Sequence, residues 1–220
     1  IGNDYYMATS AYGSGSRPTS NGARAVAIGA SAVAVGNYTY AFGKDSYATG
    51  LYATAMTRSR ASAASAFAAA IDTNSSSYGA SGANSIAMGH QAKASSTYAT
   101  AIGSNTLSSN IGTLALGAQT TASGQYSVSI GRSNIASGNY AAVIGSRDSL
   151  ASGDNSFASG QDAMATIRGQ KVHASGKFSN KGDAQGSTFI LRADTTDATA
   201  TVLTTNNSTA STDNQILAAS

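Results

Sequence analysis

Glycines recur every fourteen residues through the middle of the chain, and this repeat constrains the fold more than any other feature. Five short phrases, among them SIAMG and TLALG, end on Gly89, Gly103, Gly117, Gly131 and Gly145. Self-similarity at a fixed period is the signature of a repeat architecture. Each phrase alternates larger and smaller residues before its glycine, which predicts a short strand followed by a tight turn. We expect glycine to supply positive φ at these turns.

A half period of seven residues runs through the first part of the chain, at Gly22, Gly29, Gly36, Gly43 and Gly50. Coiled coils also repeat every seven residues, but a glycine in each heptad would cost a helix about 1 kcal/mol. The apolar spacing is moreover two, rather than the three and four of a heptad. Between Gly82 and Gly145 the residue before the glycine is apolar at one half-repeat and serine at the other, as at Ser123 and Ser137. The pattern therefore predicts fourteen-residue coils built from two unequal strands.

Three segments follow from this pattern. Residues 1–20 are expected to be a cap or linker, residues 21–176 a parallel β-roll, and residues 177–220 a separate β-rich module that continues beyond the chain given. Within the roll the phase is lost over residues 51–78, where degenerate coils with an insertion are favoured over a short helix. In the C-terminal module, strand-like runs at 187–193 and 198–204 predict a β-hairpin with its turn at 194–197.

The alternation also predicts how the coils pack. A coil this narrow is expected to hold small residues and one aliphatic row inside, leaving a second apolar row outside. An exposed apolar stripe usually marks an interface, so we expect a homotrimer, although the sequence itself does not fix the number three. The predicted stacked ladder contains Ile28, Val35, Met88, Ile102, Leu116, Ile130 and Ile144. The predicted turn glycines are Gly29, Gly36, Gly89, Gly103, Gly117, Gly131 and Gly145.

The repeat phrases resemble a known family. NGARAVAIGASAVAVG (21–36) and SVSIGRSNIASG (127–138) are similar to the head repeats of trimeric autotransporter adhesins of the YadA type. The resemblance covers about residues 21–176, although residues 51–78 depart from the pattern. It implies a left-handed parallel β-roll that forms a trimer and binds host surfaces. It maps no ligand site onto this chain.

The C-terminal segment resembles a different group of proteins. GDAQGSTFILRADTTDATATVLTT (182–205) is similar to a module of bacteriophage tail-fibre and related virion proteins, through Asp183, Gln185, Ser187, Arg192 and residues 195–199. This resemblance implies a phage tail fibre in the virion, with other tail or fibre proteins and a host cell-surface receptor as partners. The alternative is a bacterial adhesin head at the outer-membrane surface. We expect residues 177–220 to cap the roll and to hold the trimer together, because terminal repeats need a cap.

The composition gives little support to catalysis, cofactors or nucleic-acid binding. Only 10% of the residues are charged, against about 25% in typical domains, and the basic residues are scattered singly without a nucleic-acid footprint. The sequence has no apolar run of about 18 residues, so it does not predict a membrane-spanning helix. The chain lacks Cys, and its two histidines, His90 and His173, lie far apart, so neither a metal nor another cofactor is expected.

An enzyme of the tailspike depolymerase type is the alternative from another class. Glycoside hydrolysis normally needs two carboxylates about 5 to 9.5 Å apart. The only locally dense acids of the roll are Asp148, Asp154 and Asp162, in turn-like positions where Asp is favoured for its own backbone hydrogen bonds. We therefore expect a non-enzymatic protein.

Candidate receptor contacts lie where the repeat is interrupted. Tyr52, Arg58, Arg60 and Tyr78 fall in the irregular segment, and Tyr and Arg are enriched at contact hot spots. The alternative interpretation is that these side chains fill space where the coils are irregular.

Overall fold

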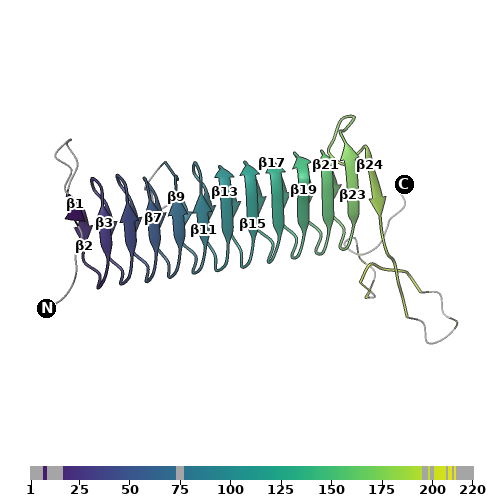
Figure 1. Cartoon of the computed structure of the whole chain (residues 1–220). Helices are drawn as coiled ribbons and strands as arrows, with labels where there is room; N and C mark the ends of the chain where they lie inside the picture. Colours follow the sequence, from purple (N-terminus) through teal and green to yellow (C-terminus); the bar gives the residue numbers. More distant parts are fainter. Residues whose placement is uncertain are drawn as a thin grey trace. The chain divides into compact units, whose positions relative to one another are not determined.

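The structure is a computed structural model that describes residues 7–8, 17–72, 77–194, 198, 201–206, 208–209 and 211. All regular structure in these residues is β, and none of them lies in a helix. The chain divides into two compact units, Ile1–Gln119 and Thr120–Ser220. Each unit is a parallel β-solenoid in which the odd-numbered strands form one sheet and the even-numbered strands another. We call these the odd sheet and the even sheet (Figure 1).

The first unit begins with very short strands. Its odd sheet contains β1 (Met7–Ala8), β3 (Val26–Ile28), β5 (Tyr40–Phe42), β7 (Thr54–Met56), β9 (Phe67–Ala69), β11 (Ile86–Met88), β13 (Thr100–Ser104) and β15 (Leu114–Ala118). Its even sheet contains β2 (Thr19–Ser20), β4 (Val33–Ala34), β6 (Tyr47–Ala48), β8 (Arg60–Ala61), β10 (Gly79–Ala80), β12 (Lys93–Ala94) and β14 (Leu107–Ser108). Since β2 already pairs with β4, the solenoid includes residues before position 21.

The second unit repeats this arrangement and ends with a reversed strand. Its odd sheet contains β17 (Val128–Arg132), β19 (Ala142–Arg147), β21 (Phe157–Gln161), β23 (Lys171–Ser175) and β24 (Gln185–Thr188). Its even sheet contains β16 (Thr121–Ala122), β18 (Ile135–Ala136), β20 (Leu150–Ala151) and β22 (Met164–Ala165). Strand β24 runs antiparallel to β23, so it closes the edge of the parallel odd sheet.

The interior of the coils is packed with small side chains. The middle residue of each short odd strand points inward, and Ala27, Ala41 and Ala101 are fully buried. The expectation of an aliphatic row inside the coil was therefore wrong for most coils. The two sheets lie so close together that a methyl group fills the space, and larger interior residues occur only locally, as at Val143 and Val172. Both rows of larger residues on the odd strands thus point outward.

Glycine is needed for two different reasons at the two ends of a coil. Gly103 has a φ of 126°, and a Cβ there would lie 1.9 Å from the carbonyl oxygen of Gly117 in the next coil. Gly29, Gly89, Gly117 and Gly131 share the positive φ. Gly36 has no positive φ, so our expectation was wrong there. Glycine is required at that position because a Cβ would lie 2.5 Å from the carbonyl oxygen of Gly50.

The segment 51–72, together with 77–78, forms coils of unequal length. Thr54 pairs with Phe67, thirteen residues later, so this coil is one residue short. Phe67 pairs with Ile86, nineteen residues later, so the next coil is five residues longer than the fourteen-residue repeat. Together these changes produce the four-residue phase offset between Gly50 and Gly82. Residues 73–76, within the longer coil, lie outside the described residues.

Gly145 does not occupy a turn-glycine position, which corrects the prediction. The register between β17 and β19 shifts, so that Gly131 pairs with Ser146 instead of Gly145. Gly145 is the extra residue of a β-bulge; its φ is 62°, and a Cβ would find no atom within 4 Å. A bulge inserts one residue into one strand, which explains the one-residue phase slip that follows Gly145 in the sequence.

The C-terminal hairpin differs from its predicted extent. The first strand is 185–188 rather than 187–193, because these residues pair with the edge strand β23. The two predicted strands meet at one antiparallel bridge, in which Arg192 and Thr204 exchange backbone hydrogen bonds of 2.9 and 3.1 Å. Residues 195–197 of the predicted turn lie outside the described residues.

Candidate functional site

The outward side of the odd sheet is apolar, and we call it the apolar face. In the first unit its rows run in register, with Ile28 opposite Phe42, Phe42 opposite Met56, Met88 opposite Ile102, and Ile102 opposite Leu116. Ile130 and Ile144 lie outward on the odd sheet of the second unit. Met88, Leu116 and Ile144 each expose about two fifths of their surface. A solvent-exposed apolar surface of this length is typical of an interface.

Val35 does not belong to this ladder, which corrects the prediction. It follows β4, and its backbone N–H donates to the carbonyl of Ala48 on the even sheet. Its neighbours on that sheet are more polar than those on the odd sheet. The outward position that follows each even strand is mostly serine or threonine: Thr49, Ser62, Ser81, Ser95 and Ser109 in the first unit, and Ser123, Ser137, Ser152 and Thr166 in the second. The even sheet therefore carries a polar row after its strands, although the strands themselves present outward apolar residues such as Ile135.

The apolar face becomes polar at the last coils of the second unit. Ser159 and His173 occupy the positions that Ile130 and Ile144 hold earlier, and the His173 Nδ1 lies 3.0 Å from the Ser159 hydroxyl. Lys171 Nζ lies 5.9 Å from the centre of the Phe157 ring. His90, the other histidine, lies 3.9 Å from Asp72 in the first unit. Across the ranges that the structure describes, no three His, Cys, Asp or Glu side chains gather as a metal site.

Aromatic side chains follow one row of turns, which the sequence reasoning missed. Tyr38 and Tyr52 stack with ring centres 5.1 Å apart, and the Arg24 guanidinium lies 5.4 Å from the Tyr38 ring. In the second unit Tyr126 and Tyr140 stack at 5.4 Å. All four tyrosines have φ values between 55° and 59°. The signal was present in the sequence, since each tyrosine stands two residues after the glycine that follows an even strand.

The four predicted receptor contacts do not form one patch. Tyr52 lies in the tyrosine row, whereas Arg58 lies in the other row of turns, 3.0 Å from Asp72. Arg60 projects from the even sheet, 6.0 Å from the Tyr47 ring. Tyr78 is half-buried and packs against the alanine core. Each side chain has its own local surroundings. Tyr52 and Arg58 are each about half exposed, so a space-filling role fits Tyr78 better than these two residues.

The three acids weighed for catalysis each have a separate cationic partner. Asp148 lies 3.4 Å from Arg147, Asp154 lies 3.5 Å from Arg168, and Asp162 lies 3.6 Å from Lys177. Asp148 and Asp162 have positive φ in one row of turns, while Asp154 lies in the other row. The geometry is that of turn residues in local ion pairs.

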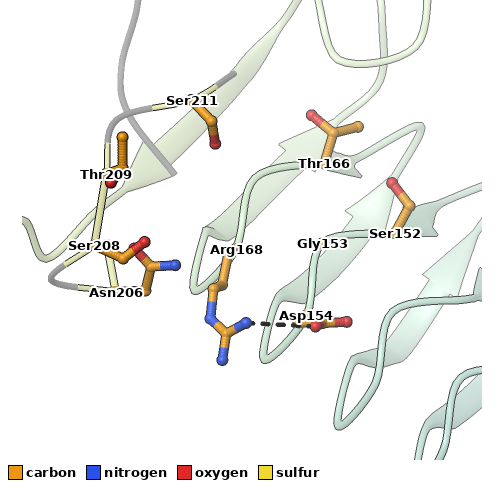
Figure 2. A pocket seen from close by; sticks show the side chains of 9 residues that line it. All are labelled: Ser152, Gly153, Asp154, Thr166, Arg168, Asn206, Ser208, Thr209 and Ser211. Atoms are coloured by element: carbon orange, nitrogen blue, oxygen red, sulfur yellow. Dashed lines mark hydrogen bonds and ion pairs between the residues drawn. The ribbon is translucent and has the colours of Figure 1, made fainter. Parts of the chain in front are cut away.

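A polar pocket of about 470 Å³ lies in the second unit, between the last turns and residues 206, 208, 209 and 211. Figure 2 shows Arg168 between Asp154 on the coil and Asn206 and Ser208 on the C-terminal segment. Its lining consists of Ser152, Gly153, Asp154, Thr166, Arg168, Asn206, Ser208, Thr209 and Ser211. Hydroxyl, amide and charged groups therefore dominate its walls.

The GDAQ phrase forms a cap on the last coil. The Asp183 carboxylate accepts backbone N–H groups of Asn180, Ser179 and Phe178 at 2.7 to 2.8 Å. These hydrogen bonds, chiefly that of Asn180, lower the pKa of Asp183. The Gln185 side chain bonds to both backbone groups of Met164 in β22. Residues 182–188 thus cover parts of both sheet edges, which agrees with the predicted capping role.

No helix in the part of the chain that the structure describes is long and apolar enough to cross a membrane.

Comparison with known proteins bears on most of the solenoid. A search of curated proteins found no match. The family model described as the YadA head domain repeat matches residues 20–46, 34–56, 80–106, 108–134, 122–147 and 146–166. These matches cover more than half of the chain, so the protein belongs to the YadA head domain repeat family.

Proposed function

We propose that this chain is part of a non-enzymatic, homotrimeric attachment fibre that spaces or presents binding to a host cell-surface receptor. The observation that carries the proposal is the apolar face. Because the coil interior is filled by alanine, two rows of larger side chains remain outside the monomer. Burying such a surface contributes about 25 cal/mol per Å². The family to which the chain belongs supports this proposal, since its head domains are trimeric adhesins.

The two sides of the solenoid favour a closed assembly over stacking on both sides. The odd sheet presents two outward rows of larger residues, with Met88 and Leu116 in one of them, whereas the even sheet has serine or threonine after most of its strands. A protomer buries the more apolar of its two sides best in a closed symmetric oligomer, with the less apolar side toward solvent. The even sheet and the turns then remain accessible for host recognition.

We further propose that the fibre belongs to a bacteriophage virion. The resemblance of the phrase that contains Asp183 and Gln185 to tail-fibre modules supports this proposal. Other virion tail or fibre proteins would then be its partners. The YadA head repeats favour the alternative, a head of a bacterial adhesin at the outer-membrane surface. Sequencing the coding region on either side of this chain separates the two: a tail-attachment or chaperone module supports the phage, and a membrane barrel contradicts it.

A matched pair of variants tests the trimer. Ile130→Asp puts a charge on the odd sheet, and Ile135→Asp puts the same charge on the even sheet, where Ile135 is 43% exposed. An unpaired buried charge is costly, so we expect Ile130→Asp to yield monomers in light scattering and Ile135→Asp to remain trimeric. A stable folded wild-type monomer at micromolar concentration would contradict the proposal, as would two trimeric variants.

The non-enzymatic assignment has its own test. Asp148, Asp154 and Asp162 each lie beside a separate cation, an arrangement unlike the facing carboxylates of a glycosidase. We expect incubation of the chain with host capsule or surface polysaccharide to release no new reducing ends. Their release would support a tailspike-type depolymerase instead.

A further inference from the structure

We propose that the polar pocket of the second unit binds an acidic saccharide, with Arg168 as the group that recognises the sugar carboxylate. The inference rests on the proposed attachment function, because it names the chemical class of the host ligand. It assigns recognition to the last coils and to residues 206, 208, 209 and 211, rather than to the four residues singled out from the sequence.

The lining determines the class of ligand. Pockets for small molecules are usually apolar, with a few polar groups that set orientation. Here the walls carry the hydroxyls of Ser152, Thr166, Ser208, Thr209 and Ser211 and the amide of Asn206. A ligand that fits between such polar walls must itself be polar, since polar groups that end up imperfectly paired on binding weaken the complex. Sugars have this character, and about 470 Å³ is enough room for one or two sugar rings.

The ion pair in the pocket determines the charge of the ligand. Asp154 is fixed by the preceding coil, because its Oδ1 accepts the backbone N–H of Asn139 at 2.9 Å. Its Oδ2 lies 3.5 Å from Arg168 Nη1, longer than the roughly 2.7–2.9 Å of a strong charge-assisted hydrogen bond. Asp154 therefore orients Arg168 without using the full donor fork of the guanidinium. A ligand carboxylate can bind that fork in bidentate fashion.

The pocket also lies on the accessible side of the solenoid. Ser152 and Thr166 follow the even strands β20 and β22, and Arg168 lies in the turn after Thr166. The apolar face is on the odd sheet, so burying it in a trimer leaves these residues exposed. Figure 2 shows the coil residues on one side of the pocket and Asn206, Ser208, Thr209 and Ser211 on the other.

Arg147 provides a matched control for Arg168. It is a similarly exposed arginine whose Nε lies 3.4 Å from Asp148, but it stands in β19 and does not line the pocket. The variants are Arg168→Gln, Arg168→Lys and Arg147→Gln, each checked for an unchanged thermal melt. Arg168→Lys keeps the charge and removes the planar fork, so it should recover only part of the binding.

Isothermal titration of the full chain with D-glucuronate, D-glucose and inorganic phosphate tests the proposal. We expect glucuronate to bind, Arg168→Gln to weaken it by about tenfold or more, and Arg147→Gln to leave it unchanged. Glucose and phosphate should each bind more weakly, because one lacks the carboxylate and the other lacks the sugar hydroxyls. Absence of glucuronate binding overturns the proposal, as does equal binding of glucose or phosphate, or an Arg168→Gln variant that binds normally.

Light scattering of the same samples separates this proposal from the proposed trimer. A monomer that binds glucuronate through Arg168 contradicts the trimer and supports the saccharide site. A trimer without glucuronate binding supports the assembly and rejects the site.

Discussion

The side-chain amide of Gln185 pairs with both backbone groups of Met164. Oε1 accepts the Met164 N–H at 2.8 Å, and Nε2 donates to the Met164 carbonyl at 2.9 Å. One side chain thus replaces a neighbouring strand at the edge strand β22 of the even sheet. On the other sheet, β24 pairs antiparallel with β23. Residues 185–188 therefore cover both sheet edges from one short segment.

Removing the Gln185 amide should loosen the end of the even sheet. We expect Gln185→Ala to lower the free energy of unfolding by about 1–2 kcal/mol, since two hydrogen bonds to the backbone are lost. Hydrogen exchange of the Met164 amide should accelerate. Gln125→Ala, at an exposed turn of the same unit, serves as control and should change stability by less than about 0.5 kcal/mol. Unchanged exchange at Met164 would show that Gln185 does not protect the edge.

Two glycines of the second unit should respond very differently to alanine. A Cβ on Gly124 would lie 1.9 Å from the carbonyl oxygen of Gly138, whereas a Cβ on Gly145 meets no atom within 4 Å. Overpacking typically costs about 1–3 kcal/mol and occasionally more, and contact with rigid backbone places Gly124→Ala at or above the upper end of that range. Gly145→Ala faces only the strain of its positive φ, about 1–2 kcal/mol. Urea unfolding of both variants measures the difference, and equal losses would contradict the stacking explanation.

The period and the strand pattern allowed the solenoid to be predicted from the sequence. Glycine spacing and the alternation of larger and smaller residues depend only on residues that are close in the sequence. The direction in which the alternating residues point was harder to predict. Ala27 and Ile28 are neighbours, and which of them lies inside depends on the distance between two sheets, which no local pattern records. Val35 was placed in the wrong sheet for another reason, because the two seven-residue half-repeats look alike in this part of the chain and Val35 follows an even strand.

The candidate surfaces depended on contacts between residues far apart in the sequence. The stack of Tyr126 on Tyr140 needs the coil register, which the repeat does supply, so this row was open to prediction. The pocket was not open to prediction, because Arg168 lines it from the solenoid and Ser208 lines it from the C-terminal segment after β24. Nothing in the repeat specifies where that segment lies. The sequence likewise showed Asp183 and Gln185 as a phrase without showing what they bind.

Acid should open the loop that Asp183 holds. Its pKa is lowered by the backbone N–H groups of Asn180, Ser179 and Phe178, so the folded loop favours the carboxylate. Its contribution to stability is present above the ordinary aspartate pKa and is lost as pH falls through the lower folded value. We expect the protection factors of the Ser179 and Asn180 amides, taken relative to intrinsic exchange at each pH, to fall in that acidic range. In Asp183→Asn the protection should be low at every pH, and a variant that retains the acid transition would contradict this assignment.

The cap itself can be separated from the rest of the C-terminal segment by two truncations. A chain that ends at Thr188 keeps β24 and Gln185 but loses residues 189–220, including one wall of the pocket. A chain that ends at Lys181 loses the cap as well, which leaves β23 as an open edge and exposes its unpaired backbone groups. We expect the shorter chain to melt about 5–10 °C below the longer one and to associate end to end at high concentration. Calorimetry and light scattering measure both effects, and two truncated chains of equal heat stability would show that residues 182–188 do not cap the solenoid.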